Sequence, residues 1–239
     1  MVEIEHATVG VGSLTGRERG EMLLLMEKYY LGVERRTFER DLDEKEHVML
    51  LRDRADGGRV VGFSTLMSLE VEVCGRPVRA IFSGDTVVEE RFRRSRGLAY
   101  EVTRYFAALL ESSAAPLYYV LICKGWRTYR ILPFLFRQFS PRFDRPTADA
   151  HRQMMHAFGA QRYPEEYDAE SGLIVFRGRT QRIRPGSAEA LGRTRGDPHL
   201  EFFARKNPDH LRGDELVCVA PVAAWNFTEA FRKLLRAEG

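Results

Sequence analysis

The sequence has few cysteines and no long apolar run, and each shortage excludes a class of protein. The three cysteines, Cys74, Cys123 and Cys218, are odd in number and far apart, with no CxxC pair. This spacing supports neither a disulfide framework nor a zinc site, so we expect free thiols. No apolar stretch approaches the roughly 18 residues that a membrane-spanning helix needs. The N-terminal segment MVEIEHATVG is acidic and lacks the apolar centre of a signal peptide, so we expect a cytoplasmic protein.

A strong excess of charge of one sign is also missing. The 37 Lys and Arg residues nearly balance the 34 Asp and Glu residues, which leaves a net charge of +3. A charge this small does not by itself indicate nucleic-acid binding. The arginines do form two groups, which keep nucleic-acid binding as a minor alternative: Arg91, Arg93, Arg94 and Arg96, and Arg177, Arg179, Arg182 and Arg184.

The histidines show no spacing typical of metal ligands. His151 and His156 are five residues apart, whereas two ligands on one helix face are four apart. We therefore expect no metal site.

What is present is the composition of an ordinary globular protein. The chain has 239 residues, of which 44% are hydrophobic and 30% charged. A chain of this length and composition buries a substantial core, as one large domain or as a core domain with an elaboration.

The first 139 residues alternate between helix and strand patterns. Apolar residues recur at helical spacing in several segments, and other segments alternate between apolar and polar residues or are apolar throughout. Thr15 is a suitable N-cap for the first helix. The predicted helices are residues 16–30, 34–44, 97–110 and 128–139, and the predicted strands are residues 47–51, 59–73, 78–88 and 117–123.

Beyond residue 140 prolines become frequent and clear strands are fewer. We expect helices at residues 149–159 and 223–237, short strands at 173–176 and 215–220, and a long surface loop at 177–197. The whole chain is predicted to be an α/β protein with a mixed sheet. Residues 1–139 form the core, and residues 140–239 form an elaboration that packs on the core or continues the same domain.

The segment from Ser83 to Tyr105 carries the most functional information. It combines a strand, an Arg-rich turn and a helix that opens at Gly97. Such a junction directs backbone N–H groups and a helix N-terminus at one anion, which suits a phosphate or pyrophosphate. Within it, the run Arg94-Ser95-Arg96-Gly97-Leu98-Ala99 fits the pattern R-x-x-G-x-A. In this run the chain resembles the acyl-CoA pyrophosphate loop of the GCN5-related N-acetyltransferase (GNAT) superfamily.

The element order of residues 15–139 also resembles the GNAT core, in which a fourth strand leads into the phosphate loop and a fifth strand leads into a fourth helix. The resemblance implies an acyl-CoA donor, with Val87 and Val88 along its pantetheine arm. It also implies that the pyrophosphate is wrapped by Arg94, Ser95, Arg96, Gly97, Leu98 and Ala99. The long C-terminal part is atypical of the family. Acyl-homoserine-lactone and N-acyl amino acid synthases elaborate this same core and take acyl chains from acyl carrier protein, which the resemblance therefore implies as an alternative donor.

Two positions depart from the GNAT pattern. Many members have an Asn after the fifth strand and a Tyr on the next helix that protonates the departing thiolate. Here Lys124 stands after the strand, and the usual Tyr register falls near Ile131 or Leu132. Tyr129 is the nearest phenol and is the candidate acid, with a packing role as its alternative.

Asp85 is the candidate general base or acceptor-binding group. It stands on a strand with apolar residues before and after it, where a carboxylate is costly unless it is paired or functional. The alternative is a turn or bulge residue that bonds to the local backbone, which the neighbouring Gly84 permits.

Together these features predict an N-acyltransferase. It would move an acetyl or longer acyl group from acyl-CoA, or from acyl carrier protein, to an amine acceptor by direct attack in a ternary complex. The alternative is a catalytically silent GNAT-like module that binds a ligand or a partner protein. The Asn and Tyr positions that do not match the pattern favour that alternative.

Overall fold

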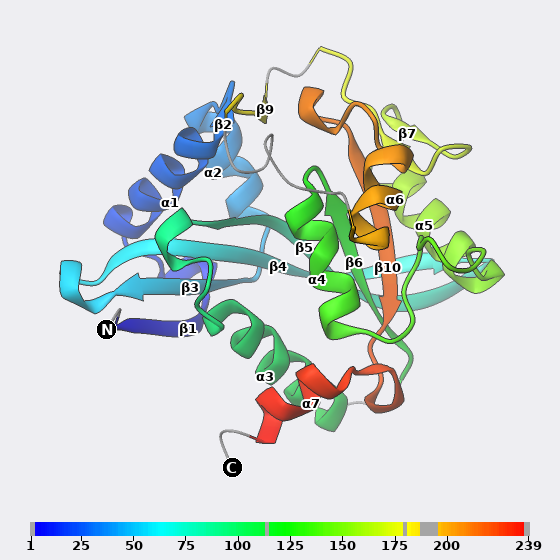
Figure 1. Ribbon diagram of the computed structural model, residues 1–239, viewed down its shortest axis with the longest axis horizontal. Coiled ribbons are helices and arrows are strands. Elements are labelled where there is room, and N and C mark those ends of the chain that lie inside the picture. The colour runs from blue at the N-terminus through cyan, green and yellow to red at the C-terminus, as the bar shows by residue number, and fades with distance from the viewer. Residues whose placement is uncertain (1–2, 113–114, 179–180, 187–195, 237–239) are drawn as a thin grey trace.

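The computed structural model describes residues 3–112, 115–178, 181–186 and 196–236, and its centre is a mixed β-sheet (Figure 1). Within these residues the sheet has eight strands in the order β1-β3-β4-β5-β6-β10-β8-β7. Neighbours are antiparallel except β5 and β6, which pair in parallel. The strands are β1 (Ile4–Gly10), β3 (His47–Asp53), β4 (Arg59–Val73), β5 (Arg76–Val88), β6 (Leu117–Cys123), β10 (Glu215–Pro221), β8 (Leu173–Ile174) and β7 (Tyr167–Asp168), with β2 (Tyr30–Leu31) and β9 (Arg182–Ile183) paired apart.

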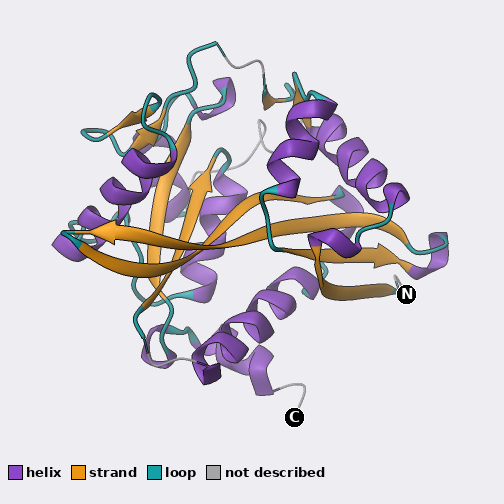
Figure 2. Ribbon diagram, turned by 180° about the vertical axis from the view of Figure 1, so that it is seen from behind, coloured by secondary structure: helices purple, strands orange, loops and turns teal. Residues whose placement is uncertain are grey.

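Helices cover both faces of the sheet (Figures 1 and 2). One face is covered by α1, α2 and α5, and the other by α3, α4, α6 and α7. The helices are α1 (Gly16–Tyr29), α2 (Arg35–Asp43), α3 (Gly97–Ser112), α4 (Trp126–Leu135), α5 (Asp149–Arg162), α6 (Pro198–Lys206) and α7 (Glu229–Arg236).

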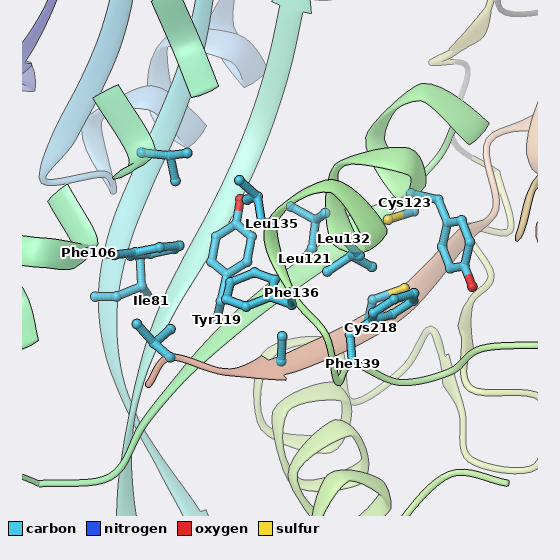
Figure 3. Packing of buried hydrophobic residues seen from close by; sticks show 14 of the residues in the cluster. Ile81, Phe106, Tyr119, Leu121, Cys123, Leu132, Leu135, Phe136, Phe139 and Cys218 are labelled. Atoms are coloured by element: carbon cyan, nitrogen blue, oxygen red, sulfur yellow. The ribbon is translucent and has the colours of Figure 1, made fainter. Parts of the chain in front are cut away.

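The alternation of side chains along β5 divides the core between these two layers. Ile81 is 1% exposed and packs with Phe106 of α3 and Leu132 of α4, as Figure 3 shows. The next residue, Phe82, is 2% exposed and packs against Phe158 of α5 at a ring distance of 5.2 Å. Both faces of the strand are therefore buried, as the apolar run in the sequence predicts.

The C-terminal part of the chain completes the same sheet. Strand β10 lies beside β6, with Cys218 opposite Leu121, and the core that contains Ile81 also contains Phe203 of α6 and Phe231 of α7. Residues after 140 therefore share both the sheet and the core of the first 139 residues.

The predicted mixed α/β architecture is confirmed, and so is the element order that the GNAT resemblance implies. Strand β6 has the predicted bounds. Thr15 caps α1 as predicted: its side chain accepts a hydrogen bond from the Glu18 N–H, and the Glu18 carboxylate accepts one from the Thr15 N–H at 2.9 Å.

Other segments differ from the prediction. The edge strand β1 was not predicted, because its segment carries no strong apolar alternation and none of its residues is fully buried. We expected helix α4 at residues 128–139, but it spans Trp126–Leu135. Pro133 therefore lies in its last turn. Helix α7 begins at Glu229 rather than residue 223. Parts of two predicted segments, the loop at 177–197 and the end of the last helix, lie outside the described residues.

Candidate functional site

The candidate site begins with an irregularity in the pairing of β4 and β5. The register shifts by one residue, so that two residues of β5, Gly84 and Asp85, lie opposite the single residue Thr65 of β4. This is a β-bulge, a feature that bends a strand and is over-represented next to active sites. It lies at the position of the sheet where the sequence places its isolated carboxylate.

The bulge determines where Asp85 points. Ile81 packs under α3 and α4, and strict alternation would send residue 85 to that same face. Instead, Asp85 lines a cavity on the other face together with Phe82 and Gly84. Because of the extra residue, the Asp85 carboxylate points to the cavity instead of the packed core.

The same point marks the end of the pairing between β5 and β6. The two strands pair in parallel from Arg79 to Ser83 of β5 and then run apart (Figure 1). Within the described residues no strand pairs with this side of β5 after Ser83. Val87 and Val88 lie in this diverging half, still paired with β4 on the other side. The edge thus offers backbone groups to an extended ligand, as an open sheet edge does to a peptide.

The cavity beside the bulge has a volume of about 560 Å³. Residues of α2, β5, α5 and β10 line it, together with those that follow β6. A cavity of this size between helices and the ends of strands is suited to a small molecule.

Two lysines and a glutamate surround Asp85 in this cavity. Lys124, which follows β6, forms an ion pair with the buried Glu215 of β10 at 2.9 Å and donates a hydrogen bond to Gln181 at 3.1 Å. Lys45 donates to the Asp41 carbonyl at 2.8 Å. These groups come from four separate segments, and folding brings them together around the bulge.

The environment shifts the titration of both Asp85 and Lys45. Burial raises the pKa of the Asp85 carboxyl above its ordinary value; Glu215 raises it further, while Lys124 and Lys45 lower it. Burial lowers the pKa of the Lys45 ammonium, against the attraction of Asp85. A carboxylate whose pKa is raised toward neutrality is better suited to accept a proton from an amine.

Thr65, which lies opposite the bulge on β4, carries an unsatisfied hydroxyl next to Gly84. The residue is 2% exposed, and its Oγ1 has no hydrogen-bond partner among the described residues. A Cβ on Gly84 would lie 2.7 Å from this oxygen, so glycine is what leaves room there. A buried hydroxyl without a partner costs about 1–3 kcal/mol, so the bulge is maintained at some cost in stability.

A small network of hydroxyls lies beside the bulge and includes Thr86, which also lines the cavity. Ser64 Oγ lies 3.2 Å from Ser83 Oγ and 2.8 Å from Thr86 Oγ1. Burial raises the pKa of Tyr119, whose hydroxyl bonds to Ser83. The region where β5 and β6 separate therefore contains both charged side chains and hydroxyls.

The Arg-rich loop leads from β5 into α3 as predicted, but Gly97 has a role that the sequence did not reveal. A Cβ at Gly97 would lie 2.5 Å from Leu51 Cδ2 and 3.2 Å from His6 Cβ. Glycine is thus required there for α3 to pack on β1 and β3. The Gly97 N–H donates to Ser95 Oγ at 3.1 Å, which caps the start of the helix.

The arginines of the loop divide into two kinds. Arg94 and Arg96 are exposed and form no ion pair within the part of the chain that the structure describes. Arg93 instead donates from Nε to the Val88 carbonyl at 3.1 Å and lies over the Tyr29 ring at 4.9 Å. The two exposed guanidiniums, beside the start of α3, are the charged groups of this loop that remain available to a phosphate.

Tyr129 lies outside the cavity. It is fully buried, packs against Phe139 and Phe203, and donates its hydroxyl to the Pro141 carbonyl at 2.9 Å. Burial raises its pKa well above the ordinary value of a phenol. A hydroxyl held by a core carbonyl is not placed to protonate a thiolate, so its position favours the packing role.

The sequence predicts no metal site, no membrane-spanning helix and free cysteines, and the described residues show the following. Among them, no three His, Cys, Asp or Glu side chains gather as metal ligands, and no helix is long and apolar enough to cross a bilayer. All three cysteines are free; Cys74 is exposed, and Cys123 and Cys218 are buried.

Among known proteins, this chain is similar only to solved structures. No family model matches the sequence, and no curated protein matches it. A "Probable N-Acyltransferase" from Enterococcus faecalis is 14% identical with a TM-score of 0.43, over 57% of this chain and 33% of that one. A GNAT family N-acetyltransferase from Escherichia coli, solved with CoA, is 13% identical with a TM-score of 0.37, over 52% of this chain and 64% of that one.

An acetyltransferase from Trypanosoma brucei is 16% identical with a TM-score of 0.39, over 61% of this chain and all of that one. The chain thus spans about a third of the first of these structures and less than two thirds of the second. Values this low carry no conclusion about activity, which has to come from the site itself.

Proposed function

We propose that this chain is an N-acyltransferase that moves an acetyl or longer acyl group from a thioester donor to an amine. The donor would be acyl-CoA or acyl carrier protein, and the amine would occupy the cavity beside Asp85. The observation that carries the proposal is the bulge at Gly84 and Asp85. It opens the sheet for an extended donor and turns a carboxylate toward the acceptor cavity at the same point.

The donor would lie along the diverging half of β5. Its pantetheine arm would pair with the backbone near Val87 and Val88, and its pyrophosphate would rest on the loop from Arg94 to Ala99. The exposed guanidiniums of Arg94 and Arg96 and the first amides of α3 supply the positive potential that a pyrophosphate requires.

The reaction needs a neutral amine close to the thioester carbonyl. Asp85 accepts a proton from the incoming ammonium, and the amine nitrogen then attacks the carbonyl carbon. In the resulting tetrahedral intermediate the nitrogen carries a positive charge. The intermediate collapses and the C–S bond breaks; the nitrogen gives up one proton to become the amide, and the departing thiolate takes up one proton. Holding both substrates where β5 and β6 separate supplies much of the rate by proximity, and the raised pKa of Asp85 makes it an effective base.

The first test measures binding and turnover together. Acetyl-CoA, or a longer acyl-CoA, is expected to raise the melting temperature because a ligand that binds only the folded state stabilises it. Release of the free thiol in the presence of amines then reports transfer. A melting temperature that no acyl-CoA changes would contradict the acyl-CoA part of the proposal. Protection without thiol release across a broad amine panel would instead favour the silent binding module.

The loop is tested with Arg94→Ala combined with Arg96→Ala. This double variant should bind acetyl-CoA more weakly and show a smaller thermal shift, because it removes two exposed cations next to the helix N-terminus. The matched control is Arg205→Ala, an exposed arginine on α6. Gly97 is not suitable for this test, since any side chain there would collide with Leu51 and disturb the fold.

A further inference from the structure

The acceptor cavity carries more negative than positive side chains. Of its described lining residues, six are acidic and four are basic. A ligand that fills the cavity displaces water from these groups, so its own charge has to complement the excess. The acidic residues are Glu34, Asp41, Glu44, Asp85, Glu166 and Glu215, and the basic residues are Arg40, Lys45, Lys124 and Arg162.

Each of the four cations is already engaged within the protein. Three form ion pairs with carboxylates of the same cavity: Lys124 with Glu215, Arg162 with Glu44, and Arg40 with Asp41. The fourth, Lys45, donates to the Asp41 carbonyl. Little cationic capacity therefore remains to bind an anionic group of a substrate.

Three carboxylates remain without an ion pair within the described residues: Asp85, Glu166 and Glu34. Asp85 lies at the bulge, Glu166 in the turn between α5 and β7, and Glu34 before the first turn of α2, where it accepts a hydrogen bond from Thr37. They belong to three different segments around one cavity. Asp85 is the proposed base, and the other two line the same cavity from segments distant in the chain.

The rest of the lining suits an aliphatic linker. Phe38, Phe82 and Phe176 contribute apolar aromatic surface to the same cavity. Methylene groups pack on such surface, and cations are attracted to the faces of aromatic rings.

We propose that the acceptor is a small dicationic amine, two ammonium groups joined by an aliphatic chain, with the reacting amine at Asp85 and the second cation held by Glu166 and Glu34. The acylation of this amine rests on the proposed function, whereas its binding in the cavity does not. The amine at Asp85 becomes an amide, and the distal ammonium keeps its charge and fixes the orientation.

Three probes of matched length test the charge requirement. Cadaverine carries two ammonium groups, pentylamine carries one, and ε-aminocaproate carries a carboxylate at the distal end. With acetyl-CoA as donor, kcat/KM is expected to be about threefold higher for cadaverine than for pentylamine, which corresponds to one additional ion pair with a half-buried and an exposed carboxylate. The aminocaproate should be the poorest of the three. The preference for cadaverine should shrink as salt is added.

Two variants locate the second cation. Glu166→Gln and Glu34→Gln should each narrow the ratio between cadaverine and pentylamine, chiefly through a higher KM for cadaverine. The matched control is Glu165→Gln, since Glu165 is exposed, neighbours Glu166 and does not line the cavity. The ratio in this control should equal that of the wild-type chain.

The outcomes separate this inference from the function on which it rests. If pentylamine is acetylated as well as cadaverine, or aminocaproate better than both, the dicationic acceptor is overturned and the acyltransferase stands. If no amine is acetylated, the proposed function fails, and calorimetry with the same probes decides the charge requirement. Cadaverine should then bind more tightly than pentylamine in the wild-type chain but not in Glu166→Gln; equal or absent binding would overturn the inference.

Discussion

The two halves of strand β5 differ sharply although they belong to one continuous strand. Residues 79–83 pair with β4 on one side and β6 on the other, and their centre, Ala80 to Phe82, is almost completely buried. Residues 84–88 pair with β4 alone, begin with a glycine and a carboxylate, and border the cavity. A single extra residue at the bulge separates these two environments.

The difference shows that stability and chemistry can be assigned to adjacent residues of one element. The first half gains free energy from buried apolar area and two ladders of hydrogen bonds. The second half keeps a carboxylate, an open edge and an unsatisfied hydroxyl nearby, all of which lower stability unless a ligand completes them. Substitutions before the bulge should therefore lower the free energy of unfolding, and substitutions after it should lower activity.

The largest effect is expected from Asp85→Asn. Loss of the base should lower kcat for amine acylation by about 100-fold or more, while acetyl-CoA still protects the variant from thermal unfolding. The matched control is Glu72→Gln, an exposed carboxylate at the far end of β4. Activity within a few-fold of the wild-type chain would show that Asp85 is not the base.

The same substitution has a defined effect on stability. The pKa of Asp85 is raised in the folded protein, so the group stabilises the fold while it is protonated, below the ordinary pKa of Asp. This contribution is lost as the pH rises through the raised pKa. Asn does not titrate, so the variant should gain melting temperature relative to the wild-type chain as pH increases. A constant difference across pH would contradict the shift.

The second prediction concerns Ile81→Ala in the paired half of the strand. Removing a buried Ile side chain should lower the free energy of unfolding by about 2–5 kcal/mol, because the packed core cannot close the resulting cavity. Denaturant unfolding measures this loss. Turnover per folded molecule should be unchanged, and a fall as large as that of Asp85→Asn would remove the distinction between the two halves.

The smallest predicted effect is a shift in pH dependence. Lys124→Met removes a cation that lowers the pKa of Asp85, so the acidic limb of kcat/KM should move to higher pH. Glu215→Gln removes a carboxylate that raises this pKa and frees Lys124, so its limb should move to lower pH. Lys28→Met, a variant of a half-exposed lysine on α1, is the control. Shifts in the same direction for the two cavity variants would contradict the electrostatic coupling.

Much of the fold follows from local sequence signals. The apolar run from Leu117 to Cys123 predicts β6 with its observed bounds, and Thr15 as an N-cap predicts the start of α1. Asp85 could also be selected from the sequence, since a carboxylate between apolar strand residues is costly without a function. These signals are local, and the structure they predict depends on few distant contacts.

The rest of the site could not be predicted because it depends on distant pairings. Glu215 reaches Lys124 only because β10 lies beside β6, and Lys45 reaches Gly84 only because α2 leads into β3 near the bulge. The roles of Tyr129 and Gly97 are also set by the surfaces against which α4 and α3 pack. A sequence motif shows that a glycine or a tyrosine occurs at such a position. Whether that residue binds a ligand or packs in the core depends on the residues around it in space.

The Arg93 side chain at the end of β5 has a consequence for solubility. A sheet that divides between two strands presents an internal edge, and free edges can recruit strands from other molecules and begin aggregation. By donating to the Val88 carbonyl, Arg93 occupies one acceptor of that edge and places a charge beside it. The guanidinium thereby protects the open part of the sheet from self-association and leaves the remaining edge to a ligand.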